Sequence, residues 1–155
     1  MALAFFSTWT TYGTWLPGDE RGWFQSAGGY QAPDLMRNLE AAFRMTDDAI
    51  TLDVEQRQLV EKTIADHCAI RNWELHAVNC RSNHVHAVVA APDRAIEIPR
   101  EQCKSWCTRK LKVREQLCDP QRVVRKNWWS ERGWDEYIDT ERSLAEVIAY
   151  VVDGQ

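Results

Sequence analysis

The stretch Asn83-His84-Val85-His86-Ala87-Val88-Val89 reads as a β-strand that carries two histidines at positions i and i+2. Side chains in a strand alternate between its two faces at a rise of about 3.3 Å per residue, so both imidazoles leave one face about 6.6 Å apart at Cα. Two rings at that separation can bind one divalent ion. The alternative is a pair of buried histidines on a half-apolar strand.

The length of 155 residues suits one domain with a single core. The 45% hydrophobic and 27% charged content is ordinary for a globular protein, and no apolar run approaches the roughly 20 residues that a membrane span needs. The segment from Met1 to Phe6 has no positive charge and reads as a first strand rather than a signal peptide. We therefore expect one domain, 1–155, in the cytoplasm and without a membrane partner.

The spacing of apolar and turn residues predicts an alternation of strands and helices. The helix that begins at Asp53 has Gln56 three residues on, which is the pattern of a capping box. The predicted strands are 5–12, 73–79, 84–90 and 134–138, the helices are 53–70, 100–116 and 140–152, and a long loop insertion at 14–51 holds a short helix at 34–44. This order predicts an α+β fold, a ferredoxin-like split βαβ sandwich whose antiparallel sheet has helices on one face, with an added C-terminal helix.

Five cysteines form an odd set without paired Cys-x-x-Cys spacing, which favours reduced thiols over a disulfide framework. Cys103 and Cys107 share a helix face. They could join the histidine pair in a zinc site, or they could pack in the core as small hydrophobic residues.

The formal net charge of −4 hides a basic segment. From Lys104 to Lys126 there are eight basic and two acidic residues, which is typical either of a phosphate-facing surface or of a solvated helix face. Trp128 and Trp129 follow, either as platforms for unpaired bases or as core residues. The candidate DNA contacts are Lys104, Arg109, Lys110, Lys112, Arg114, Arg125 and Lys126.

The last predicted helix carries a tyrosine at the edge of its apolar face. Ser143 and Glu146 have the spacing of a capping box, and the buried stripe comprises Leu144, Val147, Ile148 and Val151. Tyr150 lies at the edge of that stripe, where a phenol can reach a cleft while its ring stays partly covered. A boundary tyrosine with its hydroxyl in water would look the same.

Three segments together resemble one family. Asn83-His84-Val85-His86, the opening 10–22 (TTYGTWLPGDERG) and the C-terminal Tyr150-Val151-Val152-Asp153-Gly154-Gln155 are similar to the single-tyrosine transposases that act on single-stranded DNA. This family contains the REP-associated tyrosine transposases and the small insertion-sequence transposases. The resemblance covers nearly the whole chain, with the histidine pair and the tyrosine in the expected order.

The resemblance implies a metal-dependent endonuclease and strand transferase. His84 and His86 would bind Mg²⁺ or Mn²⁺, and Tyr150 would be the nucleophile that forms a covalent 5′-phosphotyrosine and leaves a free 3′-hydroxyl. The third ligand in relatives is commonly a glutamine about one turn after the tyrosine, and Gln155 is its counterpart here, with Asp153 or Asn79 as alternatives.

The resemblance also implies partners. They are single-stranded DNA with a hairpin and a second copy of the chain, in a homodimer where the tyrosine helix of one subunit can complete the histidine site of the other. The alternative function is that of a catalytically inactive relative retained as a DNA-binding module.

Overall fold

A computed structural model describes residues 2–25, 28–131 and 133–153. Within these residues the centre of the molecule is a four-stranded antiparallel sheet in the order β4-β5-β1-β6. Its strands are β1 (Ala4–Thr10), β4 (Glu74–Cys80), β5 (His84–Ala90) and β6 (Trp134–Ile138), and the helices that pack on it are α2 (Val54–Ile70), α3 (Glu97–Cys118) and α4 (Glu141–Asp153). The predicted ferredoxin-like sandwich with an added C-terminal helix is confirmed.

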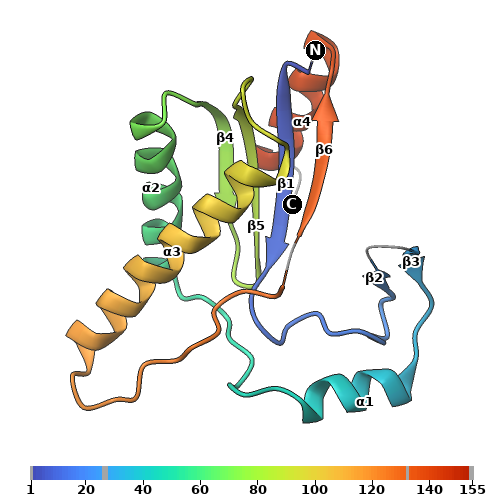
Figure 1. Cartoon of the computed structure of the whole chain (residues 1–155), viewed down its shortest axis with the longest axis vertical. Coiled ribbons are helices and arrows are strands. Elements are labelled where there is room, and N and C mark those ends of the chain that lie inside the picture. Colours follow the sequence, from blue (N-terminus) through green and yellow to red (C-terminus); the bar gives the residue numbers. More distant parts are fainter. Residues whose placement is uncertain (1, 26–27, 132, 154–155) are drawn as a thin grey trace.

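The two faces of the sheet carry different helices, as Figure 1 shows: α2 and α3 cover one face, and α4 lies on the other. The alternation along β5 explains this division. Val85, Ala87 and Val89 belong to the large core under α2 and α3, whereas Val88 belongs to a smaller core under α4. His84 and His86 therefore project from the α4 face.

Helix ends follow local sequence signals, with two departures from the predictions. The capping box of Asp53 and Gln56 at the start of α2 is present. At α4 the cap is Thr140, whose Oγ1 accepts a hydrogen bond from the Ser143 amide at 3.1 Å, so Ser143 is not the capping residue. Helix α3 begins at Glu97 rather than at 100 because Pro99 lies in its first turn, where the amide hydrogen that proline lacks has no helical partner.

The connection between β1 and α2 contains more structure than predicted. It holds α1 (Leu35–Phe43), which matches the expected short helix, and a hairpin of β2 (Trp23–Gln25) and β3 (Gly29–Gln31) that was not predicted. Strands of three residues are too short to show a period-two pattern. In Figure 1, α1 and the hairpin extend away from one end of the sheet.

Helix α1 presents an unusual apolar surface. None of its residues is buried. Its exposed apolar side chains, each more than half accessible, are Leu35, Met36, Leu39 and Phe43. Over the described ranges, no helix has the length and apolar character needed to span a membrane.

Candidate active site

A row of four polar or aromatic side chains crosses the α4 face of the sheet. The strand register pairs Asn79 with His86, His86 with Thr8, and Thr8 with Trp134. Directly paired residues in antiparallel strands point to the same face, so an amide, an imidazole, a hydroxyl and an indole lie side by side. His84 lies in the next same-face position on β5, paired with Thr10.

The two imidazoles lie close together, with ring centroids 4.7 Å apart and planes at 73°. His84 Nδ1 is 2.7 Å from the side-chain oxygen of Asn83. Because an amide oxygen only accepts hydrogen bonds, His84 Nδ1 donates to it. Asn83 thus orients the first ring of the pair.

His86 is 9% exposed, and its ring stacks on Phe6 at 5.4 Å between centroids. Burial lowers the pKa of His86 to about 4, helped by the charges of His84 and Arg81. The ring is therefore neutral at pH 7. Among the described residues, its buried Nδ1 has no hydrogen-bond partner.

Tyr150 lies beside this pair, on the last full turn of α4. Its ring centroid is 5.7 Å from that of His86 and 6.4 Å from that of Phe6. The side chain is 49% exposed, so the hydroxyl can meet a substrate while the ring leans on its neighbours. The predicted stripe of α4 packs on the sheet as expected, and it brings Tyr150 to the histidine pair of its own chain.

Asn79 holds the end of α4 in place. Its Nδ2 donates a hydrogen bond to the carbonyl oxygen of Val151 at 2.9 Å. This side-chain contact ties the last turn of α4 to β4. Val151 follows Tyr150 directly, and this contact helps to fix the tyrosine over His86.

The residues present suit a divalent metal ion. Two imidazoles on one face, of which His86 is neutral and has an orphaned buried nitrogen, form a partial ligand set. Within the described part of the chain, no group of three His, Cys, Asp or Glu side chains could hold a metal, so a third protein ligand there would be of another type, such as an amide. The predicted third ligand, Gln155, lies outside the described residues.

The basic segment is not brought next to the histidine pair. Helix α3 packs on the opposite face of the sheet, so the sheet separates its charges from the site. The prediction for Lys104 is wrong: it is buried, its Nζ donates to Ser130 O at 2.9 Å, and burial lowers its pKa. A lysine used in the interior cannot follow a phosphate backbone.

The other predicted DNA contacts fall into two groups. Arg114 pairs with Glu55, and Arg125 donates to the carbonyl oxygens of Asp48 and Asn127 at 2.6 and 2.9 Å, so both guanidinium groups already have protein partners. The second group comprises the exposed Arg109, Lys110 and Lys126 and the half-exposed Lys112.

Two alternatives for the aromatic and thiol residues are decided by burial. Trp128 and Trp129 are buried in the α2 and α3 core, so they cannot stack on bases and are packing residues. Cys103 and Cys107 lie in that same core, on the far side of the sheet from His84 and His86, so the two pairs cannot share a zinc ion.

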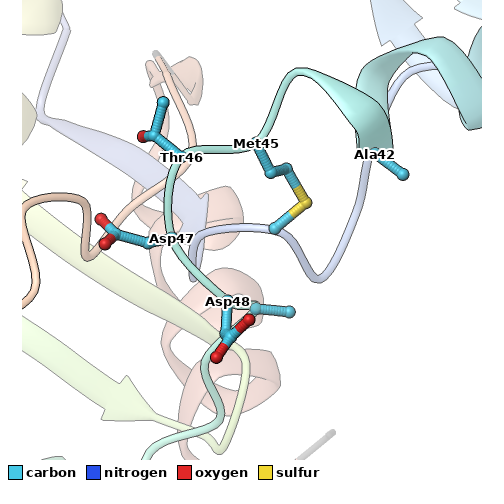
Figure 2. Close-up of a pocket in the computed structure, with 6 residues that line it drawn as sticks. Ala42, Met45, Thr46, Asp47 and Asp48 are labelled. Carbon is cyan, nitrogen blue, oxygen red and sulfur yellow. The ribbon is translucent and has the colours of Figure 1, made fainter.

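A surface pocket of about 540 Å³ lies elsewhere, in the loop after α1. Figure 2 shows the carboxylates of Asp47 and Asp48 on this loop, pointing in different directions. Asp47 accepts hydrogen bonds from the amides of Lys126 and Asn127, which ties the loop to the chain before β6. Those hydrogen bonds also lower the pKa of Asp47, so its charged carboxylate helps to hold the loop against the chain before β6. No residue of the row lines this pocket.

Sequence reasoning missed Thr8 and Trp134 and named Asn79 only as an alternative ligand. The period-two alternation of the first strand could have placed Phe6, Thr8 and Thr10 on one face. The pairing of Thr8 with Trp134 could not have been found this way, because β1 and β6 lie at opposite ends of the sequence and their register depends on the fold of everything between them.

The arrangement of the strands and helices is similar to that of a REP-associated tyrosine transposase whose structure was determined bound to a REP hairpin. The TM-score is 0.51 with 15% sequence identity, and the match covers 97% of this chain and 66% of that one. A candidate transposase from Deinococcus radiodurans R1 aligns with a TM-score of 0.49 at 16% identity, over 97% of this chain and 89% of the other. No protein-family model and no curated protein matches the sequence. The likeness to the REP-associated tyrosine transposase shows a shared fold alone, and this chain spans about two thirds of that protein's length.

Proposed function

We propose that this chain is a metal-dependent transposase-type enzyme that cuts and rejoins single-stranded DNA through a covalent 5′-phosphotyrosine on Tyr150. The observation that carries the proposal is the tyrosine ring 5.7 Å from a neutral, buried histidine that shares its face with a second histidine. The fold supports it, because a REP-associated tyrosine transposase has a similar arrangement of strands and helices.

The chemistry follows from what each group can do. His84, His86 and Gln155 are the proposed ligands of Mg²⁺ or Mn²⁺, which when bound would polarise the scissile phosphate and neutralise developing charge. The phenol oxygen of Tyr150 forms a bond to phosphorus and loses its proton. The bond from phosphorus to the 3′ oxygen breaks, and that oxygen takes up a proton to become a 3′-hydroxyl. Because the phosphotyrosine is an activated ester, a strand end can later be rejoined without ATP.

The test is adduct formation. Purified protein is incubated with Mn²⁺ and a pool of labelled single strands, some with hairpins, and the products are separated on a denaturing gel. We expect a protein–DNA adduct that disappears in Tyr150→Phe, which keeps the ring and removes only the hydroxyl. The matched control is Tyr137→Phe, because Tyr137 is an exposed tyrosine that packs against Phe5 on the opposite face of the sheet. Strand binding without any adduct would instead support the inactive DNA-binding relative.

We also propose that the chain forms a homodimer. The exposed apolar side of α1 supports this, since an apolar patch of that kind is typical of an interaction surface. Because Tyr150 lies beside the histidines of its own chain, we expect each active site to be assembled within one subunit. Mixing His84→Ala with Tyr150→Phe under subunit exchange should therefore give no cleavage. Recovered cleavage would show that the tyrosine helix acts on the partner subunit.

A further inference from the structure

Three aromatic side chains form an exposed cluster at the edge of the sheet. Phe24 of β2 is 61% exposed, Tyr30 of β3 is 60% exposed, and Trp134, the first residue of β6, is 48% exposed. The ring centroids of Phe24 and Tyr30 are 5.7 Å apart, and those of Phe24 and Trp134 are 5.6 Å apart. We call Phe24, Tyr30 and Trp134 the aromatic cluster. Single exposed apolar residues are common, but three large rings in contact indicate an interaction site.

Two rings of the aromatic cluster, those of Trp134 and Tyr30, are held by hydrogen bonds although they are not buried. Trp134 Nε1 donates to Glu136 Oε1 at 2.8 Å, and the Tyr30 hydroxyl donates to Arg21 O at 3.1 Å. Gly22, at φ +83°, leaves room for the Tyr30 ring, because a Cβ there would clash with the phenol. Rings that are fixed in advance lose little conformational entropy when they bind a flat partner.

The cluster continues the row of the candidate active site. Trp134 pairs with Thr8, and Thr8 pairs with His86, so the indole lies two strands from the imidazole on the same face. At about 4.8 Å between neighbouring strands, the two Cα atoms are about 10 Å apart. An extended chain whose phosphate lies at His86 and Tyr150 can pass over Thr8 and reach Trp134 and then Phe24.

We infer that the aromatic cluster is a stacking platform for unpaired bases next to the phosphate that Tyr150 attacks. The inference rests on the proposed function and adds a binding site to it. Flat rings suit bases because every base has a π face, and stacking of this kind is tolerant of sequence. The carboxylate of Glu136 beside the indole disfavours a phosphate at the same place. The cluster therefore contributes base contacts and few salt-dependent ones.

The experiment compares the binding of two probes to the full-length chain. One probe is a fluorescein-labelled oligothymidine, which forms no hairpin, and the other is an abasic strand of the same length. Binding is followed by anisotropy in EDTA, so no cleavage is required. Phe24→Ala and Trp134→Ala should each weaken oligothymidine binding by about tenfold, with little change in the slope of affinity against salt. Binding of the abasic strand should be unchanged, and Phe24→Trp should retain affinity.

The matched control is Tyr137→Ala, which removes a ring as exposed as that of Phe24 from the opposite face of the sheet and should bind both probes like the wild type. Circular dichroism establishes that each variant is folded. If Phe24→Ala and Trp134→Ala bind both probes like the wild type while the wild type forms the Tyr150 adduct, the platform is refuted and the proposed function stands. If the wild type binds neither probe and forms no adduct, both are refuted. If the variants change only the oligomeric mass measured by light scattering, the cluster is a contact between copies of the chain.

Discussion

Replacing Asn79 with Ala should weaken the positioning of Tyr150 while the protein stays folded. The hydrogen bond from Asn79 Nδ2 to Val151 O is a side-chain contact between β4 and the last turn of α4. The rest of the helix is docked by an apolar stripe that the substitution leaves intact, which comprises Leu144, Val147, Ile148 and Val151. The helix should therefore stay on the sheet, while its last turn, which carries Tyr150, loosens.

The size of the effect follows from that single hydrogen bond. A hydrogen bond of this kind contributes about 1 kcal/mol net, and about 1.4 kcal/mol corresponds to a factor of ten in an equilibrium. We expect the population with Tyr150 over His86 to fall about fivefold in Asn79→Ala. The rate of adduct formation should fall by the same factor, and the free energy of unfolding should fall by about 1 kcal/mol.

The assay is single-turnover adduct formation with a labelled strand at saturating Mn²⁺, beside urea unfolding of the same preparation. The control is Thr63→Ala on α2, which removes a hydrogen bond from Thr63 Oγ1 to Leu59 O on the other side of the sheet. That variant should lose similar stability and keep its rate. Equal rates in the two variants would refute the positioning role of Asn79. A weaker affinity of Asn79→Ala for Mn²⁺ would assign its amide oxygen as a metal ligand instead.

Three further predictions concern the metal, protons and salt. His84→Ala or His86→Ala should abolish cleavage and weaken Mn²⁺ binding measured by calorimetry, with the circular dichroism spectrum retained; full activity of the double variant in EDTA would contradict this. In metal-free protein, the folded state holds His86 neutral because its pKa is lowered to about 4, whereas the unfolded chain protonates near pH 6.5. The free energy of unfolding should therefore be highest above pH 6.5 and should fall, by on the order of 3 kcal/mol, as the pH is lowered to about 4. Urea unfolding of His86→Phe should lack this component, and an unchanged pH profile would refute it. Replacing the exposed Arg109 and Lys110 with Glu should flatten the slope of the logarithm of strand affinity against the logarithm of salt concentration, by about 0.7 for each phosphate that the variant no longer neutralises. An identical slope would show that these charges on α3 face solvent and do not contact DNA.

Sequence alone predicted the parts of the fold and site that depend on local periodicity. The alternation along 84–90 predicted the strand and the shared face of the two histidines, and the spacing in 140–152 predicted the helix and the edge position of Tyr150. These patterns are reliable because neighbouring side chains are placed by backbone geometry.

The parts that sequence could not predict depend on burial by distant elements. Lys104 and Trp128 belong to a basic and aromatic segment that looks like a nucleic-acid surface, yet the packing of α3 against the sheet and the loop before β6 places both inside. The aromatic cluster shows the converse, since Phe24 and Trp134 are far apart in sequence and meet only through the hairpin that was not predicted. Tertiary contacts decide whether an aromatic or basic residue faces solvent, and local patterns do not contain them.

The site lies where the smaller core ends. On the α4 face, β1 changes from Ala4 and Phe6 to Thr8, and β4 changes from Ala77 to Asn79. Strand β5 changes at the same level of the sheet, from Val88 to His86, because the register pairs His86 with both Thr8 and Asn79. All three strands therefore turn polar at one row.

The face of the sheet under α2 and α3 supplies the apolar packing that the polar row on the α4 face lacks. There the large core under α2 and α3 includes Phe5, Trp9, Val85 and Val89, so apolar packing runs along both central strands past the level of the row. Burial of apolar area is the main favourable term in folding, and most of it lies on that face. Substitutions of the row residues, and of His84 and Tyr150 beside the row, should consequently alter chemistry and DNA binding far more than folding. Variants of His84, Tyr150 and Asn79 can therefore test mechanism in a folded protein.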